Sequence, residues 1–360
     1  MLSILTSFLT SFIITYTAIP MVLRVAQIRK IFDEPDERKI HKKTIPALGG
    51  VAMFSGLFFS IMFWSQPELF INLRWVILSL VIMFLLGLKD DIVSINPYKK
   101  LIGQIVAAML VVVWGDIRLN SLHGLFGIYE LIPAIDIVLS IFVMIVIVNA
   151  FNLIDGIDGL AGGIGVIASL VFGGMFLISN EPLLALISFS LTGALLAFLR
   201  YNFSPASIFM GDGGSLVTGF ILAILCIRFI NINENLISET SHFPAPAIAL
   251  AILIVPLADT LRVFIIRIMN KKSPFSADRN HIHHLLLNLR LNHKKAALTL
   301  YLMNILFIFM SFAFFHIGVN FLFFLVVVTA FIMSQIPYII LQNKKSEKKE
   351  NGVLNLFWKR

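Results

Sequence analysis

The sequence predicts an all-α fold, that of a polytopic integral membrane protein with about eleven transmembrane helices. Hydrophobic residues make up 58% of the 360-residue chain, against roughly 45–50% in soluble domains. Charged residues are only 13%, too few to cover a soluble core that must hold 33 Phe and 13 Met. A soluble enzyme, a disordered chain and a disulfide scaffold are therefore excluded. The single cysteine, Cys226, also excludes an internal disulfide.

Long apolar runs follow one another along the chain. Each predicts a helix, because inside a bilayer every backbone amide needs an internal hydrogen-bond partner. The runs cover about 3–23, 47–64, 73–88, 101–115, 132–149, 160–179, 183–200, 213–231, 245–268, 297–317 and 319–341. The first is interpreted as a true span, since no basic segment precedes it and no cleavage site follows it.

These runs define the predicted domain organisation. Residues 1–342 are expected to form one multi-span domain, and residues 343–360 a charged cytoplasmic tail. Between the spans, the stretch 116–131 carries glycine and aromatic residues and is expected to form an interfacial turn.

The distribution of lysine and arginine predicts the orientation. With the N-terminus outside, 25 of the 28 basic residues fall in cytoplasmic segments, which leaves Arg74, Arg118 and Arg228 outside. Basic residues concentrate on the cytoplasmic side of membrane proteins. We therefore expect the C-terminus in the cytoplasm and interpret the net charge of +8 as retention on anionic lipid, with no nucleic-acid partner.

Five aspartates fall at the predicted cytoplasmic ends of spans. An ionised carboxylate near hydrocarbon is costly, so it normally has a partner or a function. Converging carboxylates repel one another unless a cation intervenes, and an all-oxygen site of this kind suits Mg²⁺ or Mn²⁺ better than zinc. The five are Asp90, Asp91, Asp155, Asp158 and Asp212.

Local sequence sharpens the expectation for each. Asp90 and Asp91 are adjacent and project about 100° apart on a helix, so one is expected to face the site while the other orients or pairs. Asp155 and Asp158 would share a face if their turn is helical. Asp212 lies in a glycine-rich turn that enters a span, where backbone N–H groups favour an anion such as phosphate.

A histidine-rich segment lies in the longest cytoplasmic loop. On a helix, His281 and His284 would share a face while His283 points away. Beside Arg279, these histidines are expected to meet phosphate oxygens or a sugar. A zinc site is the alternative, but no cysteine completes it, and His41 and His293 each stand alone in basic, solvated stretches.

Other charged residues have simpler roles. Asp259 and Arg262, three residues apart within a predicted span, are expected to form an intramembrane ion pair of structural importance. Lysines flanking the site can supply counter-charge to anionic partners; they are Lys42, Lys43, Lys99 and Lys100. Carboxylates, a hard cation, glycine turns and basic residues at a membrane surface together predict phosphoryl chemistry on a lipophilic acceptor.

The motifs, in their order, resemble those of the polyprenyl-phosphate N-acetylhexosamine-1-phosphate transferases, over about residues 1–340. The resemblance rests on Pro46-Ala47-Leu48-Gly49-Gly50, Lys89-Asp90-Asp91, Asn149-x-x-Asn152-x-x-Asp155-Gly156-x-Asp158-Gly159-Leu160-Ala161, Gly211-Asp212-Gly213-Gly214-Ser215 and His281-Ile282-His283-His284. It implies a reaction in which a UDP-N-acetylhexosamine and undecaprenyl phosphate give a lipid-diphospho-sugar and UMP. The chain would then lie in the plasma (inner) membrane with its active site at the cytoplasmic face, alone or as a homodimer.

The same resemblance implies roles for individual residues. Asp212 would hold Mg²⁺ or Mn²⁺, and Asp90 or Asp91 would activate the lipid phosphate as base or as nucleophile. Residues implied for the sugar-nucleotide and metal site are Asn152, Asp155 and Asp158, and those implied for the pyrophosphate and sugar are Lys100, His281, His283 and His284.

Two alternatives stay open. The spaced His281-Ile282-His283-His284 looks like the branch that starts O-antigen, common-antigen or teichoic-acid linkage glycans. The sugar would then be N-acetylglucosamine or a dideoxy N-acetyl relative such as N-acetylfucosamine. A phospho-MurNAc-pentapeptide transferase is the neighbouring alternative, although that branch tends to a compact run of three histidines. A secondary transporter or lipid-carrier flippase is a different class, which would place acids near the bilayer midplane.

Overall fold

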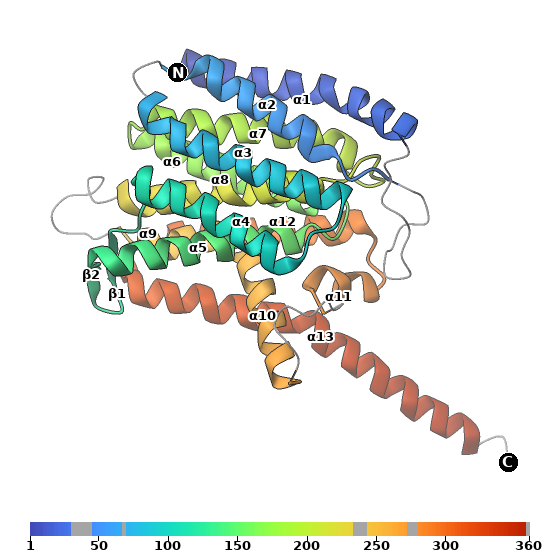
Figure 1. The fold of residues 1–360 in the computed structure, drawn as a ribbon. Coiled ribbons are helices and arrows are strands. Elements are labelled where there is room, and N and C mark those ends of the chain that lie inside the picture. The colour runs from blue at the N-terminus through green and yellow to red at the C-terminus, as the bar shows by residue number, and fades with distance from the viewer. Residues whose placement is uncertain (30–44, 67–69, 233–242, 272–279, 358–360) are drawn as a thin grey trace.

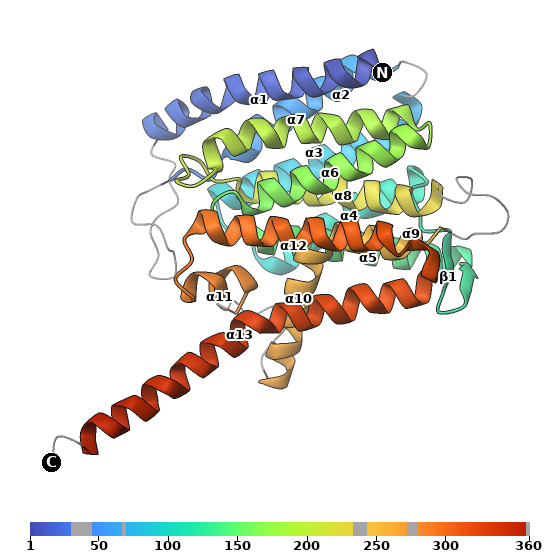
Figure 2. The ribbon, with the colours of Figure 1, turned by 180° about the vertical axis from the view of Figure 1, so that it is seen from behind.

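The computed structural model describes residues 1–29, 45–66, 70–232, 243–271 and 280–357, and nearly all of them are helical (Figure 1). The long helices lie side by side, and the start of α1 and the end of α13 are at opposite ends of the bundle (Figures 1 and 2). The helices are α1 (Leu2–Arg29), α2 (Gly49–Trp64), α3 (Phe70–Ile92), α4 (Pro97–Met109), α5 (Pro133–Ile154), α6 (Leu160–Ile178), α7 (Pro182–Asn202), α8 (Gly211–Ile232), α9 (Ala245–Ile252), α10 (Ile254–Met269), α11 (Ile282–Asn288), α12 (His293–Ala313) and α13 (Val319–Phe357).

Each predicted apolar run coincides with a helix or a pair of helices. Among the described residues, eight helices are long and apolar enough to cross a membrane, and a bent pair would make a ninth. The eight are α1, α4 with its π-helical extension Leu110–Trp114, α5, α6, α7, α8, α12 and α13 up to Lys344. The protein is therefore a mostly helical, multi-pass membrane protein. α2 and α3, the remaining two predicted spans, pack in the same bundle.

The helix α8 forms the centre of the bundle, and 83% of its apolar window is buried. It packs against α3, α5, α2 and α6. Its first turn is glycine-rich and allows very close approach: a Cβ on Gly50 of α2 would lie 2.2 Å from the Gly214 nitrogen, and one on Gly87 of α3 would lie 2.4 Å from the Asp212 carbonyl oxygen. The ends of three helices can therefore meet at Asp212.

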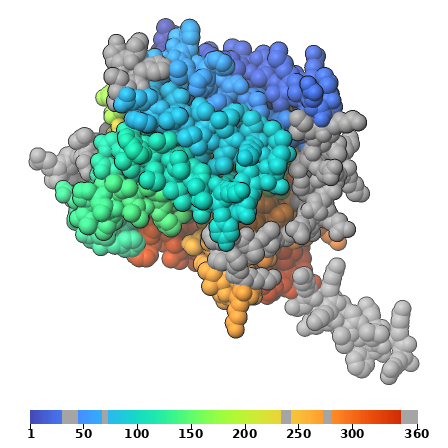
Figure 3. Space-filling view, in the orientation of Figure 1, coloured from blue at the N-terminus to red at the C-terminus, as the bar shows by residue number. Residues whose placement is uncertain are grey.

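The predicted span 245–268 is not one helix. α9 and α10 meet at Leu253 with an 80° bend, and α10 crosses the bundle and projects from it (Figures 1 and 3). The physical cause is Pro256, which has no N–H to give to the carbonyl of Ile252 four residues earlier. The buried side chain of Asn304 on α12 supplies a donor instead, at 3.1 Å from that carbonyl oxygen.

Two further features differ from a purely helical bundle. The expected turn at 116–131 contains a two-stranded antiparallel hairpin, β1 (Ser121–Leu125) and β2 (Ile128–Glu130). Asn320 of α13 holds its tip by accepting from the Phe126 amide and donating to the Gly124 carbonyl. At the other end of the chain, α13 continues as a helix through the expected tail to Phe357.

Candidate functional site

Four helix ends bring acidic residues together with one lysine. Asp90 and Asp91 end α3, Asp155 follows α5, Asp212 begins α8, and Lys100 lies in the first turn of α4. We call these five residues the acid cluster. The structure thus brings together residues that lie up to 122 positions apart in sequence, as the contact of Asp91 with Gly213 illustrates.

Asp91 fixes the start of α8. Its two carboxylate oxygens accept hydrogen bonds from the backbone amides of Asp212 at 2.7 Å and Gly213 at 2.9 Å. A carboxylate at a helix N-terminus is stabilised by the unpaired amides and by the helix dipole. On the other side of the same turn, Gly50 donates its amide to the Met210 carbonyl at 2.8 Å. Asp91 is therefore the orienting member of the adjacent pair.

Asp90 faces the lysine. Its Oδ2 lies 3.0 Å from Lys100 Nζ, and its Oδ1 accepts from the Ile95 amide at 2.6 Å, which closes the turn between α3 and α4. The same Lys100 ammonium pairs with Asp212 Oδ2. A single cation thus bridges two carboxylates that would otherwise repel each other.

Hydrogen bonds from polar side chains on α5 fix the position of Asp212. Asn152 donates to Asp212 Oδ1 and to Ser215 Oγ, both at 2.8 Å. One turn deeper, the buried Gln104 of α4 and Asn149 of α5 exchange hydrogen bonds at 2.8 and 3.3 Å. This pair joins the two helices that carry Lys100 and Asn152.

Asp155 differs from the other acids. Among the described residues, no group donates a hydrogen bond to its carboxylate. Burial, together with the nearby charges of Asp212, Asp91 and Asp158, raises the pKa of Asp155 to about 7. Its carboxylate is therefore the one most in need of a cationic partner.

Asp158, in contrast, has its partners within the chain. The helix α5 ends at Ile154, so the condition for Asp155 and Asp158 to share a helical face is not met. Asp158 is 2% exposed; its Oδ2 accepts from the Ala206 amide at 3.1 Å, and its Oδ1 lies 3.2 Å from His293 Nδ1. The expectation that His293 stands alone in solvent is wrong.

The histidine segment also differs from its predicted geometry. α11 begins at Ile282, one residue after His281, so His281 and His284 do not share a helical face. His281 and His283 stack instead, with ring centroids 5.6 Å apart, and both are buried. His284 is tilted against His283, with centroids 4.3 Å apart.

Asp259 explains this geometry. Its Oδ2 lies 2.9 Å from His281 Nδ1, and its Oδ1 accepts a hydrogen bond from the Ile282 amide at 2.7 Å. Arg262, its expected ion-pair partner, donates to the Asn280 carbonyl at 2.6 Å. Asp259 and Arg262 of α10 therefore both hold the histidine segment. The hydrogen bond from the Ile282 amide to Asp259 is the reason why the helix begins at Ile282.

The acid cluster and the histidine segment meet at loop 155–159. A Cβ on Gly156 would lie 2.3 Å from His283 Nε2, so the buried ring packs directly against this loop. Burial lowers the pKa of His283 to about 3, and this imidazole is therefore neutral at physiological pH. Two predicted site residues, Lys43 and Arg279, lie outside the described residues, as does His41.

The cluster fits a hard divalent cation only as a partial site. Among the described residues, no three histidine, cysteine or acidic side chains are grouped closely enough to hold a metal. Mg²⁺, however, is commonly bound through one or two carboxylates together with substrate phosphates. Asp155, to which no group in the described part of the chain donates a hydrogen bond, and its neighbour Asp212, whose side chain is 29% exposed, fit that requirement.

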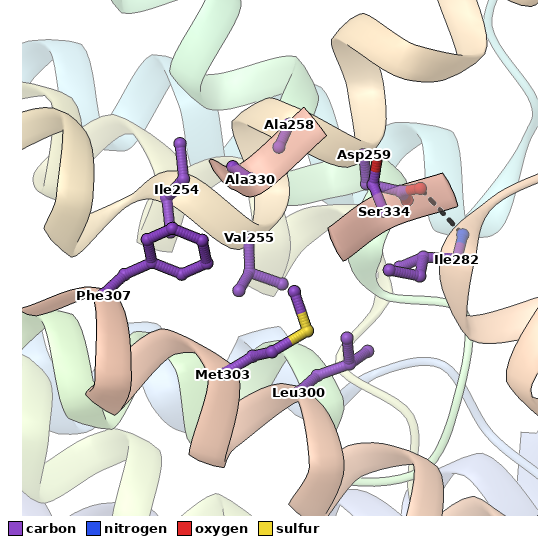
Figure 4. A pocket seen from close by; sticks show the side chains of 10 residues that line it. All are labelled: Ile254, Val255, Ala258, Asp259, Ile282, Leu300, Met303, Phe307, Ala330 and Ser334. Carbon is purple, nitrogen blue, oxygen red and sulfur yellow. Dashed lines mark hydrogen bonds between the residues drawn. The ribbon is translucent and has the colours of Figure 1, made fainter. Parts of the chain in front are cut away.

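A separate narrow crevice lies between α10, α12 and α13 (Figure 4). Its polar side chains are Asp259, which is bonded to the Ile282 amide, and Ser334. The rest of its lining is apolar: Ile254, Val255, Ala258, Ile282, Leu300, Met303, Phe307 and Ala330. No residue of the acid cluster lines it, so the crevice is not the place of the predicted phosphate chemistry.

Several residues that shape the site have no role that the sequence predicts. His293 and Tyr301 of α12 and Asn202 of α7 all contact loop 155–159. Their sequence positions could have indicated Gln104 and Asn149, because each lies one turn from a predicted site residue on the same helix face, Lys100 and Asn152 respectively. Nothing of this kind indicates His293 and Tyr301, since their partners are more than 130 positions away.

Comparison with known proteins agrees with the motifs. Residues 73–230 match the family described as glycosyl transferase family 4. The probable undecaprenyl-phosphate N-acetylglucosaminyl 1-phosphate transferase of Bacillus subtilis (strain 168) is 30% identical over 310 residues, which cover 85% of this chain and 84% of that protein. The decaprenyl-phosphate N-acetylglucosaminephosphotransferase of Mycolicibacterium smegmatis is 33% identical, with 82% and 78% covered. The undecaprenyl-phosphate alpha-N-acetylglucosaminyl 1-phosphate transferase of Haemophilus influenzae is 32% identical, with 83% and 82% covered.

Proposed function

Because this chain belongs to glycosyl transferase family 4, we propose that it transfers N-acetylglucosamine 1-phosphate from UDP-N-acetylglucosamine to undecaprenyl phosphate. A phosphate oxygen of the lipid forms a bond to the sugar-linked phosphorus, and the bond from that phosphorus to the bridging oxygen breaks. UMP leaves, and the lipid-diphospho-sugar that remains starts a cell-envelope glycan. The relatives are named for N-acetylglucosamine 1-phosphate transfer to polyprenyl phosphates.

The single observation that carries this proposal is the acid cluster at one end of a membrane bundle. Four carboxylates with one lysine leave a net negative site, which could not receive a pyrophosphate without additional cations. Mg²⁺ or Mn²⁺, held by Asp212 and Asp155, would neutralise charge on the pyrophosphate. Lys100, bonded to Asp90 and Asp212 in the structure, would turn its ammonium toward the anionic substrate.

Asp90 is the residue that we propose for activating the lipid phosphate. Both oxygens of Asp91 are occupied by the amides that start α8. Asp90, in contrast, faces the Lys100 ammonium through Oδ2 and lies beside the Asp212 side chain. A rotation of Lys100 would therefore open the Asp90 carboxylate to the lipid phosphate. Asp91 keeps Asp212 in register.

The proposed site faces the cytoplasm, where UDP-sugars are made. The acid cluster lies at the end of the bundle toward which α13 runs, and the opposite placement of the two chain ends agrees with an odd number of spans (Figure 1). We propose eleven spans in the plasma (inner) membrane, with the N-terminus outside. The bias of basic residues toward one side supports this orientation.

The test is a donor panel with the purified full-length protein in lipid nanodiscs that contain undecaprenyl phosphate. UDP-N-acetylglucosamine should give UMP and a lipid product whose mass corresponds to one added N-acetylhexosamine phosphate. UDP-N-acetylgalactosamine and UDP-MurNAc-pentapeptide should give little or none. Product from the pentapeptide alone would assign the chain to the neighbouring branch, and no product from any donor would favour a transporter.

A further inference from the structure

Loop 155–159 contains Asp155, and its own sequence does little to fix its backbone. Gly156 follows Asp155 and Gly159 follows Asp158, and Gly159 has a positive φ of 80°, so the loop backbone is permissive. Among the described residues, no hydrogen bond reaches the Asp155 carboxylate. The position of that carboxylate is therefore set by whatever holds the loop backbone.

One clamp is the hydroxyl of Tyr301. It donates a hydrogen bond to the Gly159 carbonyl. The ring lies over Gly163 in the first turn of α6, where a Cβ would be 2.0 Å from the ring carbon that bears the hydroxyl. The Tyr301 ring thus occupies the space left by the absent side chain of Gly163, the slot at Gly163. In this position the Tyr301 hydroxyl points at the loop.

A second clamp is His293, the first residue of α12. Its Nδ1 lies 3.2 Å from Asp158 Oδ1 and 3.4 Å from the Asp158 amide nitrogen. Asn202 of α7 accepts from the Gly159 amide at 2.8 Å. The backbone after Asp155 is thus held by residues of both α12 and α7.

We propose that α12 is a positioning element of the transferase: Tyr301 and His293 hold loop 155–159 so that Asp155 stays beside Asp212. The inference rests on the proposed function, because it assigns a purpose to the placement of Asp155. Neither residue touches the reacting atoms. Asp158 belongs to this clamp, which separates its role from that of Asp155 in the same motif.

The test compares Tyr301→Phe with Tyr201→Phe in the full-length protein. Phenylalanine keeps the ring that fills the slot at Gly163 and removes only the hydroxyl. Tyr201 is the matched control, since its hydroxyl also bonds to a backbone carbonyl, that of Tyr16 at 3.4 Å, but away from the loop. Two quantities are measured: kcat for UMP release, and amide hydrogen exchange followed by mass spectrometry.

The expected result is local. Tyr301→Phe should lower kcat by about tenfold, the effect of losing one buried hydrogen bond, and should speed amide exchange in residues 155–160 alone. Tyr201→Phe should leave both unchanged. Faster loop exchange with normal turnover would overturn the proposal, and so would lost turnover with unchanged exchange. Faster exchange throughout the bundle would assign Tyr301 a purely structural role.

His293 provides a second, independent variant. In His293→Asn, the side-chain amide can place a polar atom where Nδ1 lies, so this variant should keep most of the turnover. His293→Leu removes the contact and should repeat the effect of Tyr301→Phe. Equal rates for the two variants would contradict the clamp. An inactive wild type would instead refute the proposed function, so the two failures are distinguishable.

Discussion

The acid cluster and the histidine segment are built in opposite ways. The cluster forms where the ends of four long helices meet, and each acid lies at or beside a helix terminus. The histidine segment runs from His281, the residue before the short helix α11, into the first turn of that helix, and Asp259 of α10 fixes where the helix begins. The comparison teaches that long spans alone can gather the first set, whereas the second depends on a contact between distant residues.

Removing the charge of Asp212 should have the largest effect on the acid cluster. In Asp212→Asn, the side chain keeps an oxygen for Asn152 but loses the charge that pairs with Lys100. We expect UMP release to fall by on the order of 10³-fold, because several kcal/mol of charge stabilisation disappear. Excess EDTA should silence the wild type, and added Mg²⁺ should restore it. Full activity of the variant, or of the wild type in EDTA, would remove the metal role.

Neutralising Lys100 should have the next largest effect. Lys100→Met leaves Asp90 and Asp212 without the cation between them, and we expect kcat to fall by roughly 10²-fold, a loss comparable to that of one preorganised donor. Lys99→Met is the matched control, since Lys99 is the adjacent residue and is exposed. Initial rates of UMP release measure both variants. Similar losses in the two would mean that the local positive charge matters and the bridging position does not.

These cluster residues were the part of the site that sequence could predict. Ordered motifs at span ends predict that these four acids converge, because a helix end is set by the length of its apolar run. Asp158, which was predicted with them, instead contacts His293 and the Ala206 amide. The sequence did not reveal that Asp91 caps α8 and Asp90 faces Lys100, since that choice depends on which carboxylate reaches the amides of a helix 121 residues away.

The histidine segment was less predictable for a physical reason. The helical face shared by His281 and His284 assumed a helix through the whole motif, but the helix begins only after His281. The bend at Pro256 could be suspected from proline alone. Two tertiary contacts could not be predicted from sequence. They are the hydrogen bond from Asn304 to the Ile252 carbonyl and the contact between Asp259 and His281.

Asp259→Asn should sharpen the contrast between the acid cluster and the histidine segment, because it should affect stability more than turnover. The variant keeps one oxygen acceptor but loses the charged contact with His281, so the free energy of unfolding should fall by about 2 kcal/mol. Thermal unfolding in detergent and the yield of folded protein measure this. Asp116→Asn, at an exposed acid near the hairpin, should change neither. Normal unfolding with lost turnover would place Asp259 in catalysis.

An effect of similar size, spread over a range of pH, should appear as a dependence of stability on pH. His283 is surrounded by Asp259, His281, His284 and His293, and burial lowers its pKa to about 3. The unfolded chain takes up this proton near pH 6.5. Acid therefore favours the unfolded state: the contribution of His283 to stability is complete above pH 6.5 and decreases by about 1.4 kcal/mol for each pH unit below it. Unfolding midpoints of the wild type measured from pH 7.5 to 5 should fall more steeply than those of His283→Leu, which binds no proton at this position. Parallel slopes would show that His283 is not the buried neutral group on which the packing against Gly156 depends.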